Sequence, residues 1–236
     1  MTMKRITVIA GVLALPCLGM ATGCGLTGET NHSTGAYEVP DAVTALRVTA
    51  DEGEVEVIGS DRRTIAVTER LSWRKNKPAT SHEVRDGTLE LKFDCPTTFG
   101  FGTVGVECEV GYRVEVPKGL RVEVSSDSGD LKLTGLSGEL RARTDSGAIG
   151  ADGLAGGRVT ATTDSGDVTL AFTGPPDAVT TESDSGRTVV RVPGGPYDVR
   201  AETDSGEKKI TAATSASAQR RIRLRSDSGD LEVATP

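Results

Sequence analysis

The stretch "DSGDLKLTGLSGELRARTDSG", residues 127–147, holds the pattern that decides the fold. Around its first Asp-Ser-Gly triplet, apolar residues occupy every second position: Val122, Val124, Leu131 and Leu133. Alternation with a period of two predicts β-strands that bury one face. Each stretch of this kind therefore predicts a strand, a tight turn and a second strand.

The triplet recurs along the second half of the chain. It begins at Asp127, Asp145, Asp164, Asp184, Asp204 and Asp227, with spacings of 18 to 23 residues. One copy cannot bury its own apolar face, whereas stacked copies share a continuous core. The sequence thus predicts an all-β fold, a repetitive, β-helix-like β-solenoid of short strands over residues 122–236. A conventional antiparallel sandwich of twelve short strands is the alternative.

Upstream of these repeats, residues 41–121 predict an N-terminal β region with a cysteine loop. Residues 46–57, "LRVTADEGEVEV", form a divergent copy with Asp51-Glu52-Gly53 in place of the triplet. Residues 60–121 predict an insertion or separate β region, including a hairpin that turns at Asp86-Gly87. Within the repeats, Lys208 occupies an inward place, which predicts a bulge or a register slip in that copy.

The repeated aspartates allow three interpretations. In the first, each Asp accepts a hydrogen bond from the backbone two residues on and the glycine takes a positive φ, as in an Asx turn. The glycines concerned are Gly129, Gly147, Gly166, Gly186, Gly206 and Gly229. In the second, the stacked carboxylates bind calcium. In the third, two carboxylates act as general acid and base, as in aspartic proteases. Six near-periodic copies favour the turn, and we predict no catalytic residue and no cofactor.

The start of the chain has the features of an export signal. Lys4 and Arg5 precede a mostly apolar run over residues 6–18, which is too short to span a bilayer. "MATGC", residues 20–24, then resembles the bacterial lipobox, with Cys24 as the lipidated residue, carrying acyl chains such as palmitate. An ordinary cleaved secretory signal is the alternative. We expect residues 1–23 to be the signal peptide, residues 24–40 to be a flexible tether, and the protein to be lipid-anchored on the extracytoplasmic face of the cell membrane.

Charge and cysteine content narrow the partners and the compartment. Without residues 1–23 the formal net charge falls from −7 to −9, because two positive charges are lost. This balance argues against nucleic acid as a partner. Cys95 and Cys108 predict a disulfide in an exported protein. Between them, "GFGTVG" (residues 100–105) spells a dinucleotide-binding fingerprint, which we interpret as a glycine-rich loop because no helix is predicted to follow it.

Two basic clusters stand out in this acidic chain. The first is "WRKNK", residues 73–77, with Arg62, Arg63 and Arg70 upstream. It is either a solvated hairpin tip or a docking site for anionic lipid or wall polymer. The second comprises Arg220, Arg221, Arg223 and Arg225. Because it lies in the last copy, we expect these charges to protect an exposed edge strand, with ligand binding as the alternative.

The motif Ser-Gly-Asp followed by alternating apolar residues, as in residues 128–133, 165–170 and 228–233, resembles the toastrack type of the bacterial putative-adhesin domain of unknown function. The resemblance covers residues 42–235. It implies a repetitive β fold, an envelope location and no enzyme activity. We therefore expect a non-enzymatic, lipid-anchored surface module for binding, adhesion or envelope-stress scaffolding, with an envelope protein or wall polymer as partner. The alternative is a carbohydrate-active β-helix enzyme acting on an acidic polysaccharide.

Overall fold

The computed structural model describes residues 29–40, 42–96 and 108–236. The predicted signal, Cys24 and the glycine-rich segment of residues 100–105 lie outside the described residues. The described chain forms β-strands joined by turns, so the predicted all-β class is confirmed. No helix in the described ranges is long and apolar enough to cross a membrane.

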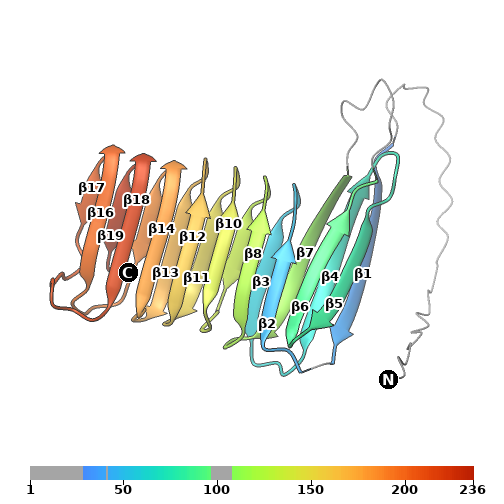
Figure 1. Ribbon diagram of the computed structural model, residues 1–236, viewed down its shortest axis with the longest axis horizontal. Coiled ribbons are helices and arrows are strands. Elements are labelled where there is room, and N and C mark those ends of the chain that lie inside the picture. Colours follow the sequence, from blue (N-terminus) through green and yellow to red (C-terminus); the bar gives the residue numbers. More distant parts are fainter. Residues whose placement is uncertain (1–28, 41, 97–107) are drawn as a thin grey trace.

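The strands form two sheets that face each other in a long stack (Figure 1). In spatial order, sheet A contains β1 (Asn31–Val39), β4 (Ile65–Trp73), β7 (Cys108–Pro117), β3 (Val55–Ser60), β9 (Leu131–Thr134), β11 (Ile149–Ala155), β13 (Val168–Gly174), β15 (Thr188–Arg191), β19 (Leu231–Ala234) and β17 (Lys208–Ile210). Sheet B contains β16 (Asp198–Ser205), β18 (Arg221–Ser228), β14 (Ala178–Ser185), β12 (Arg158–Thr163), β10 (Leu140–Thr144), β8 (Arg121–Ser126), β2 (Ala45–Thr49), β6 (Thr88–Asp94) and β5 (Ala79–Arg85).

Each coil of the chain gives one strand to each sheet, which confirms the predicted solenoid. Neighbouring coils pair in parallel and in register, so that Ile149 lies beside Leu131 on one side and Val168 on the other. All three side chains are buried, and the inward rows of both sheets are mostly Val, Leu, Ile and Ala. The core is therefore one narrow aliphatic column between the sheets, continued from coil to coil.

The N-terminal end departs from the regular stack. The divergent copy, β2 with β3, does not lie at the end, because it pairs with β8 and β9 on one side and with β6 and β7 on the other. β1, β4 and β5 complete this end with antiparallel pairings. The prediction of a tether through residue 40 is wrong for Asn31–Val39, which pair with β4 over their whole length. The described strands between residues 60 and 121 likewise belong to the same stack and do not form a separate region.

The turn at residues 86–87 and the cysteine pair lie in this end as well. Asp86 and Gly87 both have positive φ, 49° and 74°, as the predicted type I′ turn requires. Cys95 and Cys108 are joined by a disulfide across 13 residues of sequence. The bond links the end of β6 in sheet B to the start of β7 in sheet A.

At the C-terminal end the coils do not stack in chain order. β18 and β19, the last coil in sequence, lie between the β14–β15 coil and the β16–β17 coil (Figure 1). The expectation that the arginines of residues 220–225 guard an edge is therefore wrong, because β18 pairs on both sides. The expected slip at Lys208 is also wrong. Lys208 pairs in register with Leu231, and its charge is tolerated because β17 is the exposed outermost strand.

Candidate functional site

The Asp-Ser-Gly triplets stack along one long margin of sheet B. Their backbones bond directly from coil to coil: the Ser146 amide donates to the Asp127 carbonyl at 2.9 Å, and the Ser165 amide to the Asp145 carbonyl at 3.0 Å. The six carboxylates reach solvent, and in the described chain none accepts a hydrogen bond from a backbone amide. The Asx-turn interpretation is therefore wrong for the Asp side chains.

In the first two repeats the residue before the Asp closes the turn instead. Ser126 Oγ accepts a hydrogen bond from the Gly129 amide at 2.9 Å, and Thr144 Oγ1 accepts one from the Gly147 amide at 3.1 Å. The Thr144 hydroxyl donates in turn to the Gly129 carbonyl of the neighbouring coil at 3.3 Å. These hydroxyls point inward and are buried, so each one links its own turn to the next coil.

The triplet glycines are required by close packing between coils. A Cβ on Gly166 would lie 1.9 Å from the Gly147 carbonyl oxygen, and one on Gly229 would lie 2.0 Å from that of Gly186. Most of the six lack a positive φ, and Gly186, at 123°, is the clearest exception. The predicted conformational reason is thus wrong for most of them, and the turns stack too closely for any side chain.

A second set of aspartates, directly after the glycines, occurs in every other coil, and each of them bonds to the adjacent coil. Asp130 Oδ1 accepts from the Ala148 amide at 2.9 Å, Asp167 Oδ1 from the Arg187 amide at 2.8 Å, and Asp230 Oδ1 from the Glu207 amide at 2.9 Å. These are the aspartates of the Ser-Gly-Asp motif. Their role is structural, and among the described residues no group of three His, Cys, Asp or Glu side chains is placed to hold a metal ion.

The arginine-rich strand β18 forms the most distinctive polar surface. Arg221, Arg223 and Arg225 alternate on its outward face. Arg223 is held in place, since it bonds the Asp198 carboxylate and donates to the Asp198 carbonyl at 2.7 Å, and this bond lowers the pKa of the Asp198 carboxyl. Arg221 and Arg225 are exposed, and neither forms an ion pair within the described residues. They therefore keep their charge available to a partner.

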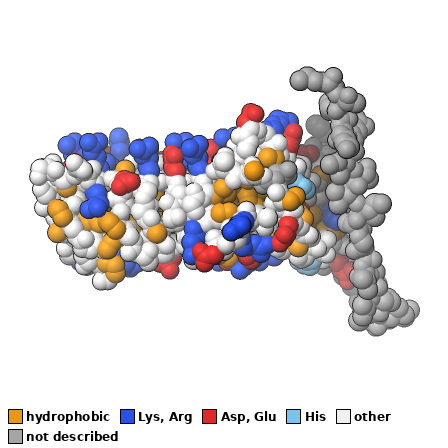
Figure 2. All heavy atoms as spheres, turned by 90° about the horizontal axis from the view of Figure 1, so that it is seen from below, with side chains coloured by type: hydrophobic (Ala, Val, Ile, Leu, Met, Phe, Trp, Pro, Cys, Tyr) orange, Lys and Arg blue, Asp and Glu red, His pale blue; other side chains and the backbone are white. Residues whose placement is uncertain are grey.

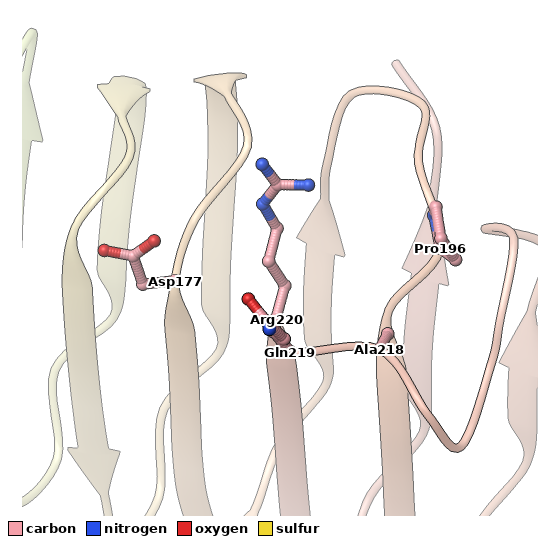
Figure 3. Close-up of a pocket in the computed structure, with 5 residues that line it drawn as sticks. All are labelled: Asp177, Pro196, Ala218, Gln219 and Arg220. Atoms are coloured by element: carbon pink, nitrogen blue, oxygen red, sulfur yellow. The ribbon is translucent and has the colours of Figure 1, made fainter.

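Three surface hollows follow β18 from its start to its end, and we call them together the β18 groove. The first, about 510 Å³, is lined by Asp177, Pro196, Ala218, Gln219 and Arg220. Figure 3 shows Arg220 extending into the space between Asp177 and Pro196. The second and third, about 230 Å³ each, share Glu182 and Arg225. The first hollow lies where the chain crosses over β18 to build the outermost coil.

Arginines on the N-terminal half of the same face behave differently. Arg47 Nη1 lies 3.1 Å from Glu90, and its Nη2 lies 3.1 Å from Glu123. Arg141 and Arg121 both pair with Glu139. Basic side chains gather along one long edge of the view in Figure 2. On the C-terminal half of sheet B, Arg221 and Arg225 form no ion pair in the described chain. The unpaired positive charge of sheet B is thus concentrated around β18.

The first basic cluster of the sequence does not form one site. Arg62 pairs with Glu38 and Glu115 before β4 begins, whereas the tip of residues 74–77 follows the other end of that strand. At the tip, Lys77 Nζ lies 5.4 Å from the Trp73 ring centroid. Nine residues of β4 separate the two groups, so they cannot bind one small ligand together.

A buried acidic cluster near the N-terminal end was missed from the sequence. Glu69 points inward and is only 7% exposed. Its carboxylate accepts from Tyr37 Oη at 2.9 Å and from Thr80 Oγ1 at 2.7 Å. Burial and the nearby Glu69 charge raise the pKa values of the Tyr37 and Tyr112 hydroxyls. The signal was present, because Glu69 falls in the inward row of residues 65, 67, 69 and 71.

Comparison with solved structures supports the fold. A putative cell adhesion protein from Clostridium sporogenes matches with a TM-score of 0.55 and 14% identity, over 87% of this chain and 100% of that one. A putative adhesin from Bacteroides fragilis matches at 15% identity over 87% of this chain and 97% of that one, with a TM-score of 0.46. At these identities the likeness concerns the fold alone. A search of curated proteins found no match.

A family model provides the sequence counterpart of this likeness. It matches residues 113–234, which include every Asp-Ser-Gly triplet and the swapped C-terminal coils. The matched segment is just over half of the chain. The chain therefore belongs to the Toastrack DUF4097 family.

Proposed function

We propose that this protein is a non-enzymatic binding module of the bacterial cell envelope, lipid-anchored through Cys24 on the extracytoplasmic face. The observation that carries the binding function is the internal position of β18. Its exposed arginines protect no edge and two of them form no ion pair in the described chain, so their charge is available to an acidic partner. The name of the Clostridium sporogenes neighbour, a putative cell adhesion protein, agrees with binding in general.

The anchor follows from the order of features at the start of the chain. A basic pair, an apolar run and a lipobox-like site precede Cys24. β1 begins only seven residues later, at Asn31. A tether this short would hold the N-terminal end of the stack close to the membrane, so the faces of the stack would be presented outward.

The anchor is tested by fractionation of cells expressing the full chain. Wild-type protein should be retained in the membrane fraction and labelled by a fatty-acid probe, and Cys24→Ser should lose both properties. Retention and labelling of the variant would contradict the anchor. The non-enzymatic assignment is tested separately, because reproducible formation of new reducing or unsaturated ends from wall polymers would overturn it.

A further inference from the structure

We propose that the β18 groove binds an extended anionic polymer that carries a phosphodiester group in each repeat. The inference rests on the proposed binding function and assigns it a site and a partner class. Arg223 and Arg225 line the groove, Arg220 and Gln219 lie at its entrance, and Arg221 lies on the same outward face of β18.

β18 is an inner strand of sheet B, so its outward arginines are not needed to protect an unpaired edge. An inner strand has its backbone groups bonded on both sides, so its outward side chains are free for other roles. Arg223 is fixed by Asp198, whereas Arg221 and Arg225 are exposed and form no ion pair in the described chain. An anionic ligand can thus gain two charge-assisted contacts without breaking an existing ion pair.

The spacing of the arginines selects an extended ligand. Alternate residues of a strand lie about 7 Å apart, so the three arginines leave the backbone of β18 in a row of that period. The first hollow lies at the start of this row (Figure 3), and the other two lie at its middle and its end. A linear polymer along β18 could place successive charges opposite successive arginines, which a compact anion could not do.

The carboxylates beside the row restrict the shape of the ligand. Glu182 on β14 and Glu202 on β16 pair in register with Arg225 from the two sides. A flat anionic surface such as a membrane would have to approach these carboxylates too, and would be repelled. A phosphodiester carries its charge in the polymer backbone and is narrow, so it can follow the arginines alone. Arg also suits phosphate because its planar donors bind two oxygens at once.

The test uses residues 25–236, which retain every described strand of the stack. Binding of a poly(glycerol phosphate) oligomer, a polyglucuronate oligomer and anionic phospholipid vesicles is measured by calorimetry at several salt concentrations. The test variant is Arg221→Gln/Arg225→Gln, which keeps Arg223 and its bond to Asp198. The matched control is Arg63→Gln/Arg191→Gln, because both residues are exposed and form no ion pair in the described chain.

We expect the phosphate polymer to bind the wild-type chain, and the test variant to weaken binding about tenfold and to reduce the salt slope by about 1 to 2. The control should stay within about twofold of wild type. Equal losses in both variants, no binding of the phosphate polymer, or preference for polyglucuronate or vesicles would each overturn the proposal. A failed polymer assay with Cys24-dependent membrane retention intact would reject the groove and leave the anchored module standing.

Discussion

The two ends of the stack are closed by different devices. At the N-terminal end the outermost strands, β1 and β5, run antiparallel to their neighbours, and a disulfide and the buried Glu69 cluster lie close behind them. At the C-terminal end β16 and β17 keep the parallel pairing of the inner coils. In β17, Lys208 occupies a position of the inward row. Residues 213–215 form backbone hydrogen bonds with Tyr197, which directly precedes β16. The comparison teaches that a solenoid can end by changing its strand direction or by making its last regular coil unfit for stacking.

The prediction with the largest expected effect on stability tests the spatial order of the last two coils. Gly229 lies between two coils and Gly206 lies in the outermost one, although a Cβ at either position would come within 2.2 Å of a carbonyl oxygen. We expect Gly229→Ala to cost about 3 kcal/mol of unfolding free energy and Gly206→Ala about 1 kcal/mol, since the end coil can shift outward. Urea titrations followed by circular dichroism measure both. The reverse ranking would mean that the coils stack in chain order.

Reduction of the disulfide should affect one end only. The bond closes a loop of 13 residues, for which the chain-entropy estimate is about 3 kcal/mol. The single tryptophan, Trp73, pairs with Cys108 and so reports on the N-terminal end. We expect reductant to lower the thermal midpoint followed by Trp73 fluorescence more than the midpoint followed by circular dichroism. Equal shifts would show that the two ends unfold together.

Each end also contains a partly buried hydrogen bond donated by a tyrosine hydroxyl, which allows a matched pair of substitutions. Tyr37 donates to the buried Glu69 carboxylate at 2.9 Å, and Tyr197 donates to the Pro193 carbonyl at 2.8 Å. Bonds to charged groups contribute more than neutral ones, so Tyr37→Phe should cost about 2 kcal/mol and Tyr197→Phe about 1 kcal/mol. Chemical denaturation of the two variants measures the difference. If Tyr37→Phe proves neutral, the Glu69 carboxylate does not depend on this donor.

A substitution of Lys208 should change the stability least, but it should cause the protein to self-associate. Lys208→Val would place an apolar side chain in the inward row of the outermost strand, where a second copy could stack. Sedimentation should then show concentration-dependent association. Lys209→Val is the control, because Lys209 faces outward and pairs with Glu232 at 3.2 Å. A strictly monomeric Lys208→Val protein would show that residues 213–215 suffice to block stacking.

Much of the fold followed from local pattern. The alternation around each triplet predicted the strands, their buried faces and the stacking of copies, and the turn at Asp86-Gly87 followed from its residues. β1 was missed because "NHSTGAYEV" lacks alternation and becomes a strand only by pairing with β4. The glycines were predicted as turn residues for the wrong reason, since the contact that requires them comes from the next coil.

Coil order lies beyond a local pattern, because two coils of similar sequence can exchange places without changing any strand. The sequence nevertheless holds two clues. Asp130, Asp167 and Asp230 fall in alternate coils only when the last two coils are exchanged. Lys208 is an inward charge that fits only a terminal strand. The β18 groove could not be inferred without this order, because the same arginines would otherwise lie at an edge.

The exchange of the last two coils also determines when the stack can be completed during synthesis or export. A chain emerges from its N-terminus, so residues 198–210 are available before residues 221–234, yet the later segment fills the place between the earlier ones. Until it arrives, the β16–β17 coil has no permanent neighbour and the aliphatic column remains open. The stack can therefore be completed only after synthesis or export has delivered residues 221–234. A protease that removes the last coil would take an inner layer from the stack and leave the outermost coil without support.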